Sequence, residues 1–64
     1  MLHSLVSAGE TLGADLRALR KARGLTLSEL ATALGRSVGW LSQVERDLSQ
    51  PSISDLRQLA ATLE

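Results

Sequence analysis

The sequence predicts an all-α fold, and three observations support that prediction: the composition, the spacing of the apolar residues and the helix-capping residues. The 64 residues include fourteen Leu and eight Ala, but only three Val, one Ile and one aromatic residue. Leu and Ala favour helices, whereas sheets favour the β-branched and aromatic residues that are scarce here. We therefore expect a compact bundle of four or five short helices.

Length and composition also limit the class of protein. A chain of 64 residues accommodates one small domain. The absence of Cys excludes disulfides and thiolate metal sites, and the sequence has neither an apolar run that could span a membrane nor a signal-peptide pattern. These features predict a soluble, cytoplasmic chain with no membrane partner and no cofactor. Residues 1–10 show no sustained hydrophobic period, so we expect a flexible N-terminal arm there and the domain over residues 11–64.

The first helix is predicted over residues 12–22. Thr11 is a suitable N-cap, and Gly24 provides a stop after a basic last turn. Apolar residues recur at helical spacing along this segment and are expected to form its buried face. They are Leu12, Leu16 and Leu19.

Two short helices are expected next. The segment TLSE at residues 26–29 is a capping box, in which the Glu side chain reaches back to the cap residue, and it opens a helix over residues 27–34. Gly35 ends this helix. Ser37 is the expected N-cap of a third helix over about residues 38–46.

A fourth helix is predicted from residue 53 to near the end of the sequence. Pro51 ends the preceding loop, and Ser52 and Asp55 have the spacing of a second capping box. The apolar stripe of this helix consists of Ile53, Leu56, Leu59, Ala60 and Leu63. If the chain self-associates, we expect the exposed ends of Leu59 and Leu63, together with the arm, to make the contact.

The short connection between the second and third helices is the feature that points to function. Residues 35–37 are too few to join antiparallel helices that lie side by side, so the two helices must cross steeply, as in a helix-turn-helix over about residues 27–46. With its inner face buried, the third helix must expose its other face. That face consists mainly of small or amide side chains: Val38, Gly39, Ser42, Gln43 and Arg46. Such a surface suits insertion into a groove.

Residues 12–63 resemble the Cro/phage-repressor class of helix-turn-helix domains, the XRE family. The resemblance is carried by LGADLRALRKARGLT, LSELATALG, SVGWLSQVER and PSISDLRQLAATL, in the family's order and spacing, over about four-fifths of the chain. It implies a lambda-repressor-like bundle whose recognition helix, about residues 38–46, lies in the major groove of double-stranded DNA. The stretch SVGWLSQVER also resembles bacterial regulators in which this domain precedes a C-terminal, small-molecule-sensing cupin domain.

The resemblance implies base-reading residues at the start and on the outer face of the recognition helix. A Gln amide can bind adenine N6 and N7, which is worth about 1–3 kcal/mol of discrimination, and a Val methyl can touch a thymine methyl. Gly39 departs from the longer polar residues of many relatives, which reduces direct readout or leaves room for water. The implied base-reading residues are Ser37, Val38, Gly39, Ser42 and Gln43.

Phosphate contacts are implied at the N-terminus of the second helix, where free backbone N–H groups and the helix dipole favour an anion, and at three side chains. The implied residues are Thr26, Leu27, Ser28, Arg36, Trp40 and Arg46. Arg36 could equally be an exposed charge without a contact. Trp40 could pack against the loop of residues 48–51 or donate its indole N–H to a phosphate. Asp47 stands where the family usually has Gly; Asp tolerates a left-handed conformation, but its charge near DNA would oppose binding.

The resemblance also implies a structural ion pair between Arg20 and Glu45. It would tie the first helix to the end of the recognition helix and would orient that helix more than it stabilises the fold, because desolvation offsets much of the attraction within a buried pair. With Arg20 engaged, few cations remain for phosphates, and the formal net charge of the chain is zero. We therefore expect one domain alone to bind DNA weakly and to release it readily in salt.

The implied function is that of the DNA-binding domain of a bacterial transcriptional regulator, such as a repressor, acting as a homodimer on a palindromic operator. No group of residues predicts an enzyme. The alternative is a protein-interaction module of the same fold, antitoxin-like or bridging-factor-like, which would show an apolar recognition face. The polar residues of the expected face favour DNA. Because the sequence ends soon after the fourth helix, we also expect it to be a fragment of a longer regulator.

Overall fold

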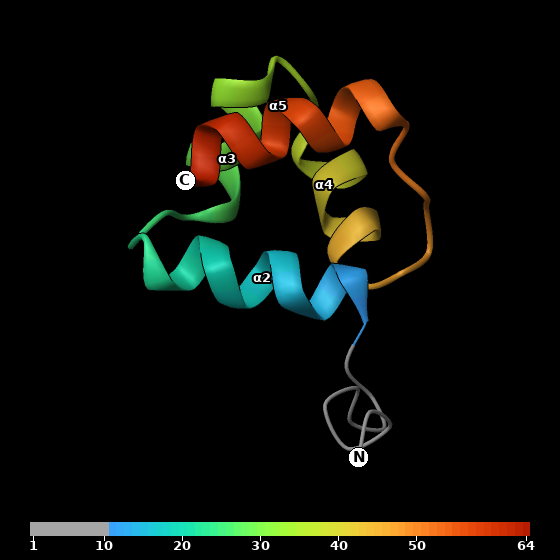
Figure 1. The fold of residues 1–64 in the computed structure, drawn as a ribbon, viewed down its shortest axis with the longest axis horizontal. Helices are drawn as coiled ribbons and strands as arrows, with labels where there is room; N and C mark the ends of the chain where they lie inside the picture. The colour runs from blue at the N-terminus through green and yellow to red at the C-terminus, as the bar shows by residue number, and fades with distance from the viewer. Residues whose placement is uncertain (1–10) are drawn as a thin grey trace.

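A computed structural model describes residues 11–64, which form four α-helices and no strand (Figure 1). The helices are α2 (Leu12–Ala22), α3 (Leu27–Leu34), α4 (Val38–Glu45) and α5 (Ile53–Leu63). These bounds match the predicted segments, except that α4 ends at Glu45 and Arg46 is its C-cap. The expected arm, residues 1–10, lies outside the described residues. Over the described part of the chain, no helix is long and apolar enough to cross a membrane.

Each helix begins at a hydroxyl side chain that caps it. The Thr11 and Ser37 hydroxyl oxygens accept hydrogen bonds from backbone N–H groups three residues later, at 3.1 and 3.0 Å. Both predicted capping boxes are present, at Thr26 and at Ser52. Each such cap contributes about 1 kcal/mol, so local sequence alone specifies where the four helices start.

Three helices end in the same way, with a residue in the left-handed conformation. Gly24, Gly35 and Asp47 have φ angles of 71°, 68° and 61°. Beyond each of them, a backbone N–H closes the last turn of the helix: Leu25 to Arg20 at 3.1 Å, Arg36 to Ala31 at 3.0 Å and Leu48 to Gln43 at 2.8 Å. This is the hydrogen bonding of a Schellman motif. Glycine adopts such a φ without strain, whereas Asp47 adopts it with a side chain present.

The four helices enclose the core: α2 lies along one side of the molecule, α3 and α5 lie together on the other, and α4 lies between the two sides (Figure 1). The main contacts between helices are those of α2 with α4, of α4 with α3, and of α3 with α5. The buried apolar side chains come from all four helices: Leu16, Leu30, Ala31, Leu41, Val44, Leu59 and Leu63. Because Ala31 is small and almost fully buried, α3 and α4 can approach each other closely.

Two of the predicted apolar stripes are wrong in part. Leu12 and Leu19 are 48% and 41% exposed, and the buried residues of α2 are Gly13, Leu16 and Arg20. On α5, Ile53 is 69% exposed and Ala60 is exposed as well. Conversely, Leu59 and Leu63 are 1% and 0% exposed, so the side chains expected to mediate self-association belong to the core.

Candidate nucleic-acid interface

The helix-turn-helix unit consists of α3, the turn at residues 35–37 and α4. Leu30 and Ala31 of α3 are buried in the same core cluster as Leu41 and Val44 of α4. With both inner faces covered, the opposite face of α4 is left at the surface. The turn itself depends on the left-handed conformation at its first residue, a glycine that also closes α3.

The five residues expected to read bases lie at the start of α4 and along its outer face. Ser37, Val38, Gly39 and Gln43 are exposed, and Ser42 is half-buried. A Cβ atom placed on Gly39 would have no atom within 4 Å, so the surface around this position is open. The five residues therefore form one accessible surface, which we call the α4 face.

The N-terminus of α3 offers fewer free donors than the sequence indicates. The Thr26 backbone N–H donates to Glu29 Oε1 at 2.8 Å, so it is not available to a phosphate, contrary to the expectation. This hydrogen bond, more than any other interaction, lowers the pKa of Glu29 below its ordinary value. Within residues 11–64, the backbone N–H groups of Leu27 and Ser28 have no partner, as is usual in the first turn of a helix.

Arg36 has partners that sequence reasoning did not identify. Its Nη1 lies 2.6 Å from Asp55 Oδ1, and its guanidinium carbon lies 3.8 Å from the ring centroid of Trp40. Trp40 itself is half-buried against the core. Arg36 is thus held between α4 and α5 instead of extending as a free cation. The spacing of Arg36 and Trp40, four residues apart, is the signal from which their contact could have been inferred.

Arg20 and Glu45 form the ion pair that the resemblance implies. Arg20 Nε and Nη2 donate to the two carboxylate oxygens of Glu45 at 2.7 and 3.1 Å, and Arg20 Nη1 donates to the Leu25 carbonyl at 2.9 Å. Both side chains are buried. The hydrogen bond to Glu45 raises the pKa of Arg20 above its ordinary value, so the guanidinium stays charged. This ion pair joins the last turn of α2 to the last residue of α4.

Asp47 directs its carboxylate toward the N-terminus of α2. Oδ1 accepts a hydrogen bond from the Gly13 backbone N–H at 3.1 Å, and Oδ2 accepts a short one from the Thr11 hydroxyl. A negative charge at this end of a helix is favourable, because it satisfies unpaired N–H groups and complements the dipole. The conformation of Asp47 is the one expected from the sequence, but its role as a remote cap was missed, since nothing local connects residues 13 and 47.

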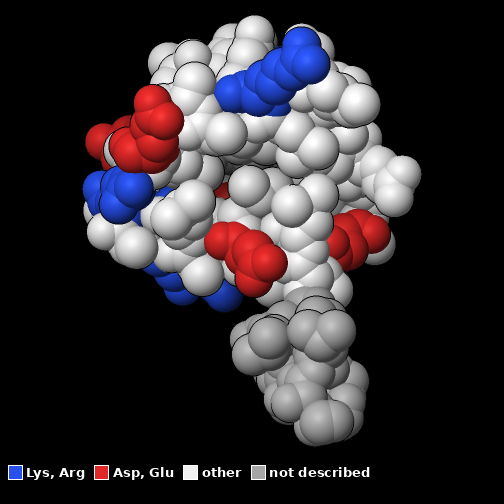
Figure 2. Space-filling view, viewed as in Figure 1, with Lys and Arg blue, Asp and Glu red and all other residues white. Residues whose placement is uncertain are grey.

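On the face shown in Figure 2, acidic and basic side chains lie in separate small groups on a largely uncharged surface, and no large area carries one sign. Among residues 11–64 there is also no group of three His, Cys, Asp or Glu side chains placed to hold a metal ion.

Comparison with known proteins identifies the family. A family model described as a helix-turn-helix domain matches residues 11–64. The chain belongs to the helix-turn-helix domain family. The domain is homologous to transcriptional regulators: it is 47% identical over 47 residues to the HTH-type transcriptional regulator DdrOP3 of Deinococcus deserti, covering 73% of this chain and 36% of that protein.

Other relatives of this helix-turn-helix domain are a phage repressor and a regulator with a known structure. It is 40% identical to the immunity repressor protein of Bacillus phage phi105 over 83% of this chain and 37% of that protein. It is 39% identical to the HTH-type transcriptional regulator SinR of Bacillus subtilis over 83% of this chain and 49% of that protein. The chain thus spans about a third to a half of the length of these relatives.

A solved structure has the same fold. It is the crystal structure of SinR, the master regulator for biofilm formation, in complex with DNA. The two structures superpose with a TM-score of 0.77 at 39% sequence identity, over 83% of this chain and 86% of that one. The predicted all-α fold, with a central helix-turn-helix, is confirmed.

Proposed function

We propose that this helix-turn-helix domain binds double-stranded DNA sequence-specifically, as the DNA-binding domain of a bacterial transcriptional regulator, with α4 in the major groove. The observation that carries the proposal is the exposed α4 face, held on a buried core in the fold that SinR adopts in its complex with DNA. An α-helix fits the major groove, and its N-terminal residues then meet the base edges.

Base readout would come from the α4 face. Gln43 offers an amide for the N6 and N7 positions of adenine, Val38 a methyl surface for thymine, and Ser37 and Ser42 hydroxyl groups that suit several bases. The open space at Gly39 would admit water or leave a base unread. Specificity would therefore rest mainly on the single Gln amide.

Contacts to the DNA backbone would come from the Leu27 and Ser28 backbone N–H groups and from the Thr26 hydroxyl, beside the positive end of the α3 dipole. Arg46, exposed at the end of α4, would supply a guanidinium. Trp40 could donate its indole N–H. Arg36 is paired with Asp55 and lies over the Trp40 ring, so we assign it to the support of α4; its remaining N–H donors could also reach a phosphate.

We further propose that the regulator acts as a homodimer on a palindromic operator in the cytoplasm. The relatives DdrOP3 and SinR are longer than this chain, which leaves room in them for a dimerisation region outside the helix-turn-helix. Two domains joined across a twofold axis would compensate for the absence of surplus positive charge in each one. The resemblance of residues 37–46 to cupin-bearing regulators makes a C-terminal cupin sensor our proposal for the effector-binding part.

Selection of bound duplexes from a random DNA pool tests the proposal. We expect a palindromic consensus, which would establish both readout and twofold symmetry. Gln43→Ala should relax the preference at one position in each half-site, while the matched control Gln58→Ala, an exposed Gln on α5, should select the wild-type consensus. A pool without enrichment, or binding that does not change with salt concentration, would contradict DNA binding and favour the protein-interaction alternative.

A further inference from the structure

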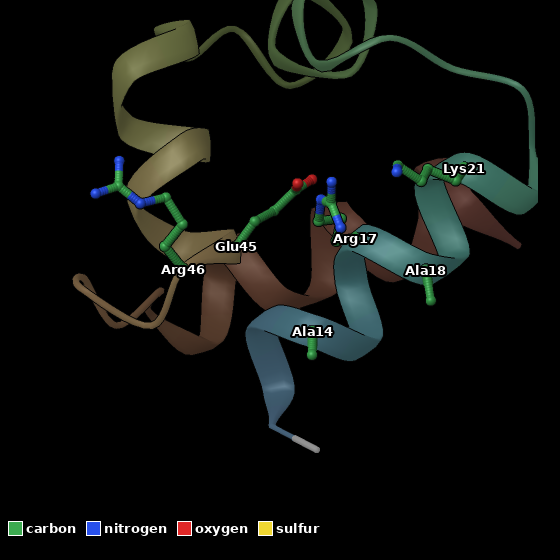
Figure 3. A pocket seen from close by; sticks show the side chains of 6 residues that line it. All are labelled: Ala14, Arg17, Ala18, Lys21, Glu45 and Arg46. Carbon is green, nitrogen blue, oxygen red and sulfur yellow. The ribbon is translucent and has the colours of Figure 1, made fainter. Parts of the chain in front are cut away.

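A groove between α2 and the end of α4 is lined by basic residues that are not part of the α4 face. It has a volume of about 590 Å³ and is lined by Ala14, Arg17, Ala18, Lys21, Glu45 and Arg46 (Figure 3). We propose that this groove, which we call the α2–α4 groove, binds a phosphate of the DNA backbone. The inference rests on the proposed function and adds α2 to the DNA-binding surface.

The first argument is the state of the basic residues. The chain has seven, and three of them are engaged within the fold. Arg20 is bound to Glu45, Arg36 to Asp55, and Arg23 Nε donates to the Leu63 carbonyl at 2.6 Å, at the C-terminus of α5. Within residues 11–64 the other four have no hydrogen-bond or ion-pair partner: Arg17, Lys21, Arg46 and Arg57. Three of these four line the α2–α4 groove.

The second argument is the state of the one acid in the lining. Glu45 would repel an anion if its charge were unopposed. Both of its carboxylate oxygens, however, accept hydrogen bonds from Arg20, which is buried beside it. The charge of Glu45 is thus balanced inside the fold, and the potential in the groove is set by the cations at its edge.

The third argument is position. Arg46 is the C-cap of α4, so it belongs both to the end of the recognition helix and to the lining of the groove. Figure 3 shows the Arg17, Lys21 and Glu45 side chains directed into the space between α2 and α4, whereas Arg46 stands at the rim, with its guanidinium on the outer side of α4. With α4 in the major groove of DNA, the strand that borders the major groove would pass Arg46 and continue to α2.

The chemistry of the lining matches a phosphodiester. A guanidinium can donate two parallel hydrogen bonds to phosphate oxygens, and an ammonium supplies a compact positive charge. The Ala14 and Ala18 methyl groups leave the approach along α2 unobstructed. The phosphate ligand carries no sequence information, so the groove should contribute affinity and orientation, and not base preference.

The test is the salt dependence of DNA affinity for Arg17→Ala and Lys21→Ala, with Arg57→Ala as the matched control on α5. Each lost phosphate contact should reduce the slope of log affinity against log salt by about 0.9. We expect this change for both groove variants, with affinity lower by roughly fivefold to tenfold at about 0.1 M salt, equally on the selected operator and on a random duplex. Arg57→Ala should keep the wild-type slope.

A charge-insertion pair provides an independent variant. Ala18→Glu places a carboxylate in the groove, and Ala61→Glu makes the same change of net charge at an exposed position of α5. Only Ala18→Glu should weaken DNA binding. Thermal unfolding of each variant checks that the fold is intact. We expect wild-type melting, because all five substituted side chains are at the surface.

The outcomes separate this inference from the proposed function. Wild-type slopes for Arg17→Ala and Lys21→Ala, on a wild-type protein that binds DNA, would overturn the groove and leave the proposed function standing. Equal losses for Arg17→Ala and Arg57→Ala would also overturn it, because the effect would then be one of net charge. Failure of the wild-type protein to bind any duplex would overturn both.

Discussion

Asp47 is a single residue on which two helices depend. Its left-handed backbone, with φ of 61°, closes α4, and its carboxylate caps the N-terminus of α2. The first role would suit glycine better, and the second requires an acid. The carboxylate therefore offsets the cost of the conformation, and its charge is directed at α2 and not left free.

Substitution of Asp47 should separate the two roles. We expect Asp47→Ala to lower the free energy of unfolding by about 1–3 kcal/mol, because it loses the cap and retains the strained φ. Asp47→Gly should lose less, since it loses the cap but relieves the strain. Urea unfolding followed by Trp40 fluorescence measures both. Equal stability of the two variants would show that the φ strain is unimportant, and wild-type stability of Asp47→Ala would contradict the capping role.

Glu45 is the second residue whose contacts reach beyond its own helix. Glu45→Gln would leave Arg20 buried without a counter-charge. Breaking a buried pair lowers the free energy of unfolding by about 3–5 kcal/mol. The loss should be smaller here if the Gln side-chain oxygen keeps one hydrogen bond to Arg20. We expect stability and DNA affinity to fall together, because the pair fixes α4 against α2. Thermal unfolding and gel-shift titration provide the two readouts. The exposed Glu64→Gln is the control, and a Glu45→Gln protein with unchanged melting and affinity would show that the pair has no such role.

At the scale of elements, the contact between α2 and α4 is decided by a glycine. A Cβ on Gly13 would lie 2.5 Å from the Val44 carbonyl oxygen and 2.6 Å from that of Glu45, both backbone atoms. The absence of a side chain thus lets the start of α2 rest directly on the end of α4. The same approach places the Gly13 N–H within reach of Asp47.

Two Gly→Ala substitutions inside helices should therefore have opposite signs. Ala is intrinsically better than Gly in a helix by up to about 1 kcal/mol. Gly39→Ala, at a position where a Cβ has no atom within 4 Å, should gain part of this stability. Gly13→Ala should lose about 1–3 kcal/mol, because α2 must move away from α4. Chemical unfolding of the pair checks the prediction, and a stabilised Gly13→Ala would mean that the two helices are not in close contact.

The elements that the sequence predicted well are those whose signals are local. Thr11, Ser37 and the two capping boxes lie within four residues of the donors they cap, so the helix bounds followed from the chain itself. The buried face of α2 did not. Leu12 and Leu19 are apolar but exposed, because Gly13 and Arg20 occupy the face that meets α4. That outcome depends on residues more than twenty positions away.

The candidate site shows the same division. The α4 face was predicted because it depends on the period of one helix. The partner of Arg36 was not predicted, because Asp55 reaches it from α5. The Thr26 capping box was predicted, but the Thr26 N–H was still expected to be free for a phosphate, and the capping box itself engages it. The α2–α4 groove was also missed, since Arg17 and Lys21 become part of a site only when α4 is placed beside them.

At the scale of the whole molecule, the zero net charge reflects how the acids are used. Glu45 neutralises Arg20, Asp55 neutralises Arg36, and Asp47 and Glu29 cap helices. These acids are engaged by groups of the fold, whereas three cations without a hydrogen-bond or ion-pair partner among residues 11–64 line one groove. A balanced total charge is therefore compatible with a local surface that attracts an anion.

The same use of acids predicts how the molecule responds to low pH. Hydrogen bonds from the Ser52 and Thr26 backbone N–H groups lower the pKa of Asp55 and Glu29, and Arg36 lowers that of Asp55 further. A carboxyl with a lower pKa in the folded state stabilises the fold above its ordinary pKa, here 3.8 for Asp55 and 4.5 for Glu29, and loses this contribution as the pH falls through the folded value. We expect the free energy of unfolding to be level between neutral pH and about pH 5 and to fall as the pH drops below 5.

Urea titrations from pH 7 to pH 2 measure this dependence of the free energy of unfolding on pH. Glu29→Gln and Asp55→Asn should each show a shallower fall than wild type, whereas Glu64→Gln should not. A Glu29→Gln protein with the full wild-type fall would exclude the Thr26 capping box as a source, and the same result for Asp55→Asn would exclude the Ser52 capping box and the Arg36 pair.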